Sequence, residues 1–322
     1  MRSRRARSAM VRVSAFSESI GDRRLTVLTV GYFLVVTFLM ALSGAWPTPD
    51  KFLIAGLLFA LLLARPGTFL RDWSPFVALF LGYEYLRGLI PALGWTVNVH
   101  PLICADLFLF GEIPTLTLQR LLFAEAGPRF YDYLFTLTYM AHFALPLGFA
   151  LLLWVRSRAE FRLFMTALSV LCFAAFLTYL LYPARPPWMA ADQGLIPPVA
   201  NVMGRTIALF DRGPGLPTFY VLMSPNMVAA MPSLHAAFPA MVYLFALKRY
   251  GWKGNVFLLY AAMVWIGIVY TAQHWVVDVF AGMAYALLIF FAVLHFDARR
   301  RRRRPSSQAA VLPAQAESTR SV

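Results

Sequence analysis

The segment QHWVVDVFAG, residues 273–282, places a histidine and an aspartate inside a long apolar stretch. An aspartate at the centre of a membrane helix costs about 2.5–3.5 kcal/mol on insertion scales, so the pair needs a reason to be there. His274 and Asp278 are four residues apart and share one face if the segment is helical. The carboxylate can then bind one imidazole nitrogen and raise the basicity of the other, which prepares a nucleophile or general base. A structural pair between packed helices is the alternative.

A second histidine lies in MPSLHAAFP, residues 231–239. Pro232 and Ser233 are typical of a helix start, with Ser233 as the N-cap. The free backbone N–H groups and the dipole of such a helix end favour an anion. His235 would stand in the first turn beside that anion, as a catalytic residue or as an ordinary interfacial histidine.

An arginine follows in PARPPW, residues 183–188, directly after an apolar segment. The prolines end the helix and stiffen the chain that leaves it. Arg185 could bind phosphate with its guanidinium fork. It could equally be an interfacial arginine that extends toward lipid headgroups.

The composition indicates a membrane protein with several spans. The chain has 322 residues, of which 60% are hydrophobic and 14% charged, and its mean hydropathy is +0.64. Soluble domains carry about 25% charged residues. The net charge of +14 comes largely from seven arginines before residue 25 and six more at Arg299–Arg304. Basic flanks of apolar spans are a topology signal, so we expect anionic membrane lipids rather than nucleic acid as partners.

Hydropathy predicts eight membrane spans, and the charges between them predict that both termini are cytoplasmic. Every even-numbered connection is short and basic, and the two long connections, 94–129 and 183–232, fall on the outer side. Long ordered loops on one face usually carry function. The expected spans are residues 25–46, 52–64, 74–93, 130–154, 161–182, 233–248, 255–273 and 274–296.

The chain divides into four regions on this interpretation. A basic cytoplasmic arm covers residues 1–24, and N-terminal spans with an outer loop cover 25–129. A catalytic transmembrane core covers 130–297, and a basic, disordered tail covers 298–322. Cys172 lies in a span and Cys104 in a loop, so we expect no disulfide between them.

This topology brings the polar clusters to one membrane face. The fifth span ends there, and the sixth and eighth begin there, with Asp278 about 6 Å deeper than His274 at 1.5 Å per residue. Two histidines, an arginine and a helix N-terminus make a site for attack on a phosphate ester. One histidine attacks, the other protonates the leaving oxygen, and the N–H donors hold the remaining phosphate oxygens.

The motifs RP, PSLH and HWVVD, in this order, resemble the type-2 phosphatidic acid phosphatase superfamily, whose pattern is Lys-x6-Arg-Pro, Pro-Ser-Gly-His and Ser-Arg-x5-His-x3-Asp. The resemblance is strongest over residues 170–285. It implies an all-α membrane protein, a bundle of about six to eight transmembrane helices around a phosphatidic-acid-phosphatase-type core. His274 would become phosphorylated, Asp278 would orient it, and His235 would be the general acid. Arg185 and Ser233 would hold phosphate, with no metal and no other cofactor.

The sequence departs from that pattern at several positions. Thr178 stands where the first lysine belongs, Gly267 and Ile268 replace Ser-Arg, and Leu234 replaces glycine. With PPW, PSLH and a His-aromatic-x-x-Asp motif, the chain looks more like the branch with fungal inositol phosphorylceramide synthase. That branch transfers phosphoinositol or a related headgroup between lipids. The candidates for the missing cations are Arg120, Arg129, Arg205 and Arg212.

Other polar and aromatic residues have simpler expected roles. Arg87 pairs with Glu84 in the third span, and His142 is a packed polar residue or a contact for the acceptor alcohol. Three aromatic residues, Tyr139, Trp188 and Trp275, would be interface anchors.

We therefore expect an integral lipid phosphatase or phosphotransferase in the cell membrane, with its active site on the extracytoplasmic side. Its partners would be a lipid phosphate and an alcohol or water acceptor. A bacterial cell membrane is expected because arginine far outnumbers lysine, as in GC-rich genomes. Two alternatives use the same residues: a metal-dependent hydrolase with His235, His274 and Asp278 as ligands, and a proton-coupled transporter in which His274 and Asp278 relay protons.

Overall fold

The computed structural model describes residues 66–140, 142, 144–208 and 228–303, and every regular element among them is helical. Isolated backbone bridges, but no strand, occur in this part of the chain. The predicted spans 25–46 and 52–64 and the residue Arg212 lie outside the described residues. The first helices are α3 (Pro66–Leu89), η1 (Ile90–Leu93), α4 (His100–Phe110), α5 (Pro114–Leu122), α6 (Phe130–Met140) and α7 (Ala144–Arg156). They are followed by α8 (Arg158–Leu181), α9 (Pro187–Asp192), α10 (Val202–Ala208), α12 (Leu234–Tyr250), η2 (Gly251–Asn255), α13 (Val256–Tyr270) and α14 (Val276–Arg302).

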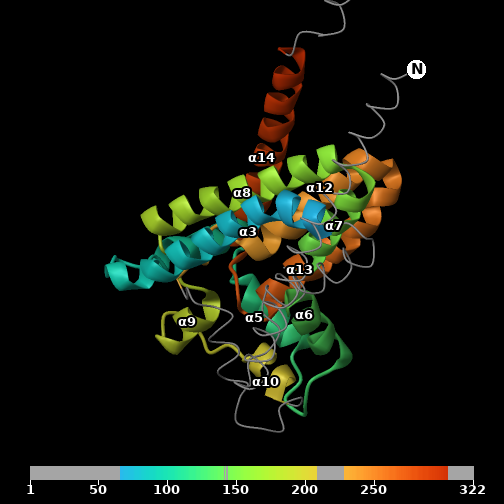
Figure 1. The fold of residues 1–322 in the computed structure, drawn as a ribbon. Helices are drawn as coiled ribbons and strands as arrows, with labels where there is room; N and C mark the ends of the chain where they lie inside the picture. The colour runs from blue at the N-terminus through green and yellow to red at the C-terminus, as the bar shows by residue number, and fades with distance from the viewer. Residues whose placement is uncertain (1–65, 141, 143, 209–227, 304–322) are drawn as a thin grey trace, which may run out of the picture.

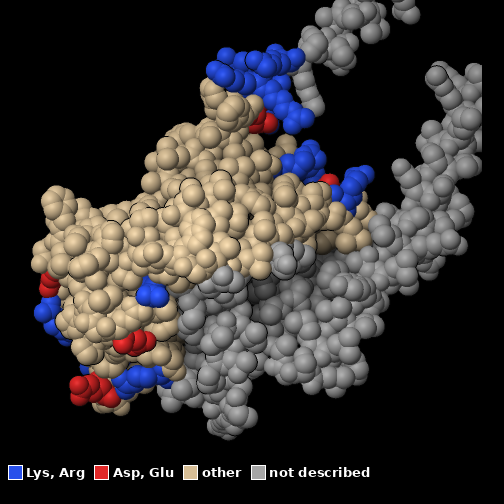
Figure 2. All heavy atoms as spheres, turned by 90° about the vertical axis from the view of Figure 1, so that its left-hand side faces the viewer, with Lys and Arg blue, Asp and Glu red and all other residues tan. Residues whose placement is uncertain are grey.

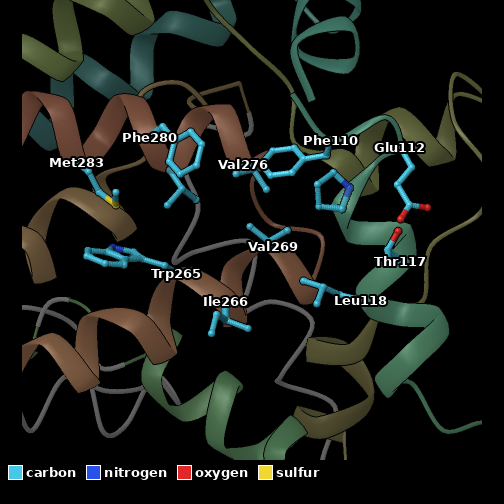
Figure 3. Close-up of a pocket in the computed structure, with 12 residues that line it drawn as sticks. Phe110, Glu112, Thr117, Leu118, Trp265, Ile266, Val269, Val276, Phe280 and Met283 are labelled. Carbon is cyan, nitrogen blue, oxygen red and sulfur yellow. The ribbon is translucent and has the colours of Figure 1, made fainter. Parts of the chain in front are cut away.

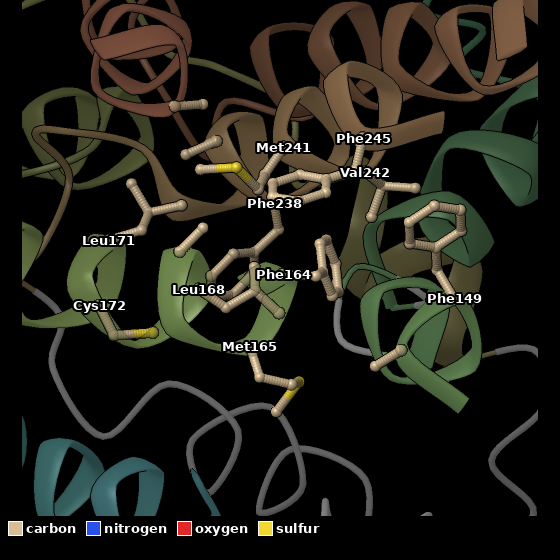
Figure 4. Packing of buried hydrophobic residues seen from close by; sticks show 14 of the residues in the cluster. Phe149, Phe164, Met165, Leu168, Leu171, Cys172, Phe238, Met241, Val242 and Phe245 are labelled. Atoms are coloured by element: carbon tan, nitrogen blue, oxygen red, sulfur yellow. The ribbon is translucent and has the colours of Figure 1, made fainter. Parts of the chain in front are cut away.

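The main core lies between α8, α12 and α14, with α3 and α7 against α8 (Figures 1 and 4). Aromatic and aliphatic side chains from α8 and α12 interdigitate, with Phe164 edge-on to Phe245 at 5.1 Å between ring centroids. Edge-to-face aromatic pairs add about 0.5–1.5 kcal/mol beyond the burial of their area. Ser157 caps the start of α8 by accepting a hydrogen bond from the Glu160 backbone N–H. The start of α8 and the apolar side chains that form this core are therefore both determined by residues of the helices themselves.

The helices α12 and α13 form a hairpin, because η2 reverses the chain and the two helices pack along each other. Trp265, near the end of α13, donates its indole N–H to the carbonyl of Ala236, near the start of α12. α14 packs against α12 at a very close approach, where a Cβ on Gly282 would lie 2.2 Å from the carbonyl oxygen of Ser233. Only glycine fits there, so this contact fixes the position of α14 relative to the start of α12.

Charged side chains gather at two ends of the described part and leave a broad uncharged face between them (Figure 2). At one end, Arg158 pairs with Asp72, and Glu160 pairs with Arg249 and, at 3.8 Å, with Lys248. The arginines at the end of α14 extend beyond the helix layer. An apolar belt between charged ends is the surface of a protein that crosses a membrane.

Three helical segments of the described chain are long and apolar enough to span a membrane: Arg158–Leu181, Leu234–Tyr270 and Val276–Arg302. The second comprises the α12–α13 hairpin. α4 and α5 form a fourth candidate together, a pair bent by 67°. The chain is thus an all-α membrane protein, and the predicted spans 161–182, 233–248, 255–273 and 274–296 each coincide with a helix.

Two sequence predictions differ from the helices observed. The predicted span 130–154 is divided into α6 and α7, and Pro146 supplies the reason, since its ring clashes with the carbonyl four residues earlier in a continuous helix. The predicted span 74–93 is divided between α3, which begins earlier at Pro66 and ends at Leu89, and η1. The predicted outer loops contain helices of their own, α4 and α5 in the first and α9 and α10 in the second. α5, α6, α9 and α10 lie together on one side of the long helices (Figure 1).

Candidate active site

His274 lies in a five-residue turn between α13 and α14, and not on α14 as its spacing to Asp278 suggested. The turn is closed by the carbonyl of Ile268, which accepts hydrogen bonds from the backbone N–H groups of Gln273 and His274. The His274 ring is 5% exposed. Its Nδ1 is 3.0 Å from the carbonyl oxygen of Ala230. Because a carbonyl only accepts, Nδ1 carries the proton and the lone pair of the neutral ring is on Nε2.

Asp278 is fully buried one turn into α14, and its Oδ2 lies 3.5 Å from Nδ1 of His274. The same Oδ2 accepts a hydrogen bond of 3.0 Å from the backbone N–H of Trp275. Asp278 therefore fixes the turn through its backbone and supports the proton on Nδ1 through its charge. Tyr182, just beyond α8, is close enough for this charge to act on it. Burial, together with the charge of Asp278, raises the pKa of the Tyr182 hydroxyl.

His235 meets His274 across the gap between α12 and the turn. Its Nδ1 is 3.1 Å from Nε2 of His274, the atom that carries the nucleophilic lone pair. Ser233 is the N-cap of α12, as predicted, and its Oγ accepts from the Ala236 N–H at 3.2 Å. Ser233 is fully buried, and its own N–H donates to the Asp278 carbonyl. His235 is partly exposed while His274 is buried, so a substrate reaches this pair from the His235 side.

Two rings pack against His235: Tyr139, which was expected to be an interface anchor, and His142, which was expected to be a packed polar residue or a contact for the acceptor alcohol. Tyr139 stacks on its face, with ring centroids 4.3 Å apart and planes within 16°, so Tyr139 is not an interface anchor. His142 lies 4.0 Å from His235 between ring centroids and is 5% exposed. Its Nδ1 donates to the Tyr139 carbonyl at 2.7 Å. The break between α6 and α7 therefore brings two rings against the second histidine and fixes its orientation.

Arg185 contacts the His274 turn through a hydrogen bond to its backbone carbonyl and not through its guanidinium. Ala184 bridges to Ala229 and Asn98 on its two sides, and the carbonyl of Arg185 accepts the indole N–H of Trp275 at 2.8 Å. Trp275 is thus fully buried, which overturns its expected role as an interface anchor. The Arg185 side chain donates to Gln193 at 3.1 Å, while its Nε is buried without a hydrogen-bond partner among the described residues. A buried N–H donor that has no acceptor is suited to bind an anion, which would supply the missing hydrogen bond.

The bent pair α4–α5 clamps both ends of the His274 turn, which the sequence analysis missed. Asp106 is fully buried, and its two carboxylate oxygens accept from the backbone N–H groups of Val276 and Val277 at 3.1 and 3.0 Å. From α5, Thr115 donates to the carbonyl of Val269 at 3.0 Å, and Gln119 donates to the carbonyl of Tyr270 at 2.9 Å. The signal was an aspartate within the apolar run ADLFLF, since a buried carboxylate requires donors.

The positions that depart from the family pattern have structural roles here. Thr178 hydrogen-bonds to the hydroxyl of Tyr285 at 2.7 Å. The carbonyl of Gly267 accepts from both the backbone and the hydroxyl of Thr271. A Cβ on Gly267 would come within 2.9 Å of the Phe135 ring. Leu234 packs in the main core.

Three of the four predicted substitutes for the missing cations lie in the described part of the chain, and no contact joins them to the histidines. Arg120 pairs with Glu112 and Thr117, Arg205 lies over the Phe123 ring at 4.8 Å, and Arg129 is exposed after α5. Arg87 of α3 is instead close enough for its charge to act on His142 and His235. Its guanidinium also lies 5.7 Å from the ring of Tyr83, and the side chain of its expected partner, Glu84, is outside what the structure describes.

The metal-dependent alternative requires a cluster of ligands. Among the described residues, no three His, Cys, Asp or Glu side chains converge in a metal-binding arrangement. Cys104 is exposed on α4 and Cys172 is buried in α8, each as a free thiol. The arrangement does bring two imidazole rings into contact, with a buried carboxylate beside one of them.

Comparison with known proteins places this geometry in a family. Residues 113–292 match the sequence profile of the PAP2 superfamily, whose members are lipid phosphatases and phosphotransferases. Phosphoinositol dihydroceramide synthase of Bacteroides thetaiotaomicron is 28% identical over 67% of this chain and 74% of its own length. Inositol phosphorylceramide synthase of Candida albicans is 27% identical over 46% of this chain, and the match spans a third (33%) of that protein. No solved structure gave a significant match. The chain therefore belongs to the PAP2 superfamily, as an enzyme of the branch that resembles inositol phosphorylceramide synthase.

Proposed function

We propose that this protein transfers a phosphoinositol or related phosphodiester headgroup from a lipid donor to a lipid alcohol, through a phosphohistidine on His274. The observation that carries the proposal is the pairing of His274 Nε2 with His235 Nδ1 at 3.1 Å, with Nδ1 of His274 held by the Ala230 carbonyl. The similarity to two synthases of inositol-containing sphingolipids supports the choice of headgroup.

In the first half of the reaction, Nε2 of His274 attacks the phosphorus of the donor lipid. The P–O bond to the lipid alcohol breaks, and His235 gives its proton to the leaving oxygen. The attacked phosphorus must approach Nε2 to about 3–3.5 Å, a place that His235 occupies at 3.1 Å. The two rings therefore separate as the substrate enters, and the backbone contact of His274 Nδ1 with the Ala230 carbonyl holds the nucleophile in place.

In the second half, the hydroxyl oxygen of the acceptor attacks the phosphorus and the P–N bond breaks. His235 now takes the proton of that hydroxyl, which returns both rings to their starting states. Asp278 stabilises the positive charge that develops on His274 during the attack. Arg185 and Ser233 are the predicted phosphate-binding residues, and the buried Nε of Arg185 is the donor best placed to serve.

We place the site at the extracytoplasmic face of the cell membrane, with both termini in the cytoplasm. The support is the distribution of basic residues. Lys248, Arg249 and Arg299–Arg302 lie at the ends of α12 and α14 that are opposite the histidines. Positive charge flanks the cytoplasmic ends of spans.

The function is tested with the purified protein in vesicles that contain radiolabelled phosphatidylinositol. Adding dihydroceramide should convert the label into phosphoinositol dihydroceramide. Omitting dihydroceramide should leave only slow hydrolysis by water. Release of free inositol phosphate at the same rate with and without dihydroceramide would contradict transfer and indicate a hydrolase of the phosphodiester. The same vesicles with a prenyl phosphate in place of phosphatidylinositol test whether the donor is a phosphodiester.

A further inference from the structure

An apolar groove of about 420 Å³ lies between α13, α14 and the bend of the α4–α5 pair (Figure 3). Trp265, Ile266 and Val269 of α13 form one wall. The side chains of Phe280 and Met283 on α14 face them across the groove. Ile266 is 48% exposed and Phe280 is 47% exposed, so the groove opens sideways between two helices that are apolar enough to span the membrane.

The groove begins beside the turn that carries His274. Val269 and Val276, which both line it, stand on either side of the five-residue turn that carries His274. From Val276 it continues along α14 to Met283, about 10 Å at 1.5 Å per residue. A molecule lying in it would therefore extend from the level of His274 into the apolar part of the span.

The polarity of the groove changes along its length. Glu112 and Thr117 line the end at the α4–α5 bend, where Arg120 contacts both of them. The end near Trp265 and Met283 is apolar. A lipid has the same gradient, with hydrogen-bonding groups at the headgroup end and hydrocarbon below.

We propose that this groove holds one hydrocarbon chain of the lipid phosphate substrate while its phosphorus lies at His274. The inference rests on the proposed function for the identity of that lipid. One wall of the groove is also the clamp of the turn: α4 holds Val276 through Asp106, and α5 holds Val269 through Thr115. A chain in the groove thus contacts the same two residues that fix the position of the nucleophile.

The direct test is photo-crosslinking of the full-length protein in phosphatidylcholine vesicles, with a phosphatidylinositol that carries a diazirine in its acyl chain. The His274→Ala variant is used beside the wild type, because it binds the probe without consuming it. We expect crosslinks on α13 and α14 around Ile266 and Phe280, removed by excess phosphatidylinositol and not by further phosphatidylcholine. Equal competition by both lipids, or crosslinks only on other faces, would overturn the proposal and indicate ordinary bilayer contact.

A kinetic test uses Ile266→Trp, which fills the groove, and Leu259→Trp as its control. Leu259 is 64% exposed two turns earlier on the same face of α13 and does not line the groove. Each methylene excluded from the groove weakens binding about fourfold. Ile266→Trp should raise KM for long-chain phosphatidylinositol about tenfold and leave kcat unchanged. The KM for dihexanoyl phosphatidylinositol, whose short chains do not reach into the groove, should stay at the wild-type value. Equal effects of both variants would count against the groove.

The two proposals fail separately. Transfer activity without competed crosslinks in the groove would reject the chain-binding site and leave the reaction intact. Competed crosslinks in a protein that transfers no headgroup would reject the reaction and retain the lipid-binding groove.

Discussion

At the scale of single residues, the site depends on which atom of each histidine carries the proton. The Ala230 carbonyl determines this for His274, and Asp278 adds its charge from 3.5 Å. The sequence analysis predicted the histidine–aspartate pair from their spacing, but a backbone carbonyl from another segment has no sequence signature. Asp106 is the residue that the sequence could have revealed, since it is an acid in an apolar run that ends up fully buried.

Replacing Asp106 with Asn should weaken catalysis without abolishing the fold. The amide keeps one acceptor oxygen and places an NH2 donor against the other backbone N–H, so one of the two hydrogen bonds to the start of α14 is lost and the other loses its charge. Hydrogen bonds to charged groups contribute about 1.5–3 kcal/mol each. A turn displaced by about 1 Å costs up to 10²-fold in rate. We expect kcat to fall by about that factor and KM to stay close to wild type, measured by headgroup transfer in vesicles. The exposed Asp192→Asn is the control, and an unchanged kcat in Asp106→Asn would show that the clamp is not needed.

At the scale of helices, three contacts set the distance between His235 and His274. α14 touches the start of α12 at Gly282, the α12–α13 hairpin is fixed by Trp265, and α4–α5 holds the turn between α13 and α14. The helix boundaries were largely predictable, because caps, apolar length and charge are local signals. The separation of α6 from α7 was not predicted, although Pro146 indicated it, and Tyr139 and His142 of this region lie against His235.

Gly282→Ala tests the contact between α14 and α12. Its Cβ would lie 2.2 Å from the Ser233 carbonyl oxygen, so α14 must move away from α12. Overpacking of this kind costs about 1–3 kcal/mol, and the movement separates the two histidines. We expect a lower thermal midpoint in detergent and a loss of most transfer activity. The control is Gly148→Ala, in the exposed part of α7 with open space around it, which should keep the wild-type thermal midpoint and transfer activity. A fully active Gly282→Ala would contradict the account of this contact.

At the scale of the whole molecule, the charges predicted the membrane character and the fold class more surely than the details of the site. Apolar length and basic flanks are written in contiguous sequence, and the helices α8, α12, α13 and α14 followed from them. The roles of Arg120 and Arg205 did not follow, because their partners come from the folding of the outer segments. Which side of the membrane the site faces is a prediction from charge alone.

Cysteine accessibility tests that orientation. In a Cys104→Ser background, Glu125→Cys places a thiol on the exposed chain after α5, and Lys253→Cys places one in η2, at the end of α12 away from the histidines. The buried Cys172 is expected not to react. A membrane-impermeant maleimide applied to intact bacterial cells should label Glu125→Cys, and should label Lys253→Cys only after permeabilisation. The reverse pattern would place the active site on the cytoplasmic side.

The central claim is that His274 carries the headgroup during transfer. The most direct measurement is rapid acid-free quenching of the purified protein after mixing with phosphatidylinositol labelled with ³²P, in the absence of acceptor. The account predicts alkali-stable, acid-labile label that maps to His274, disappears on addition of dihydroceramide, and is absent from His274→Ala. Headgroup transfer at the wild-type rate by His274→Ala, or label on a different residue, would contradict it.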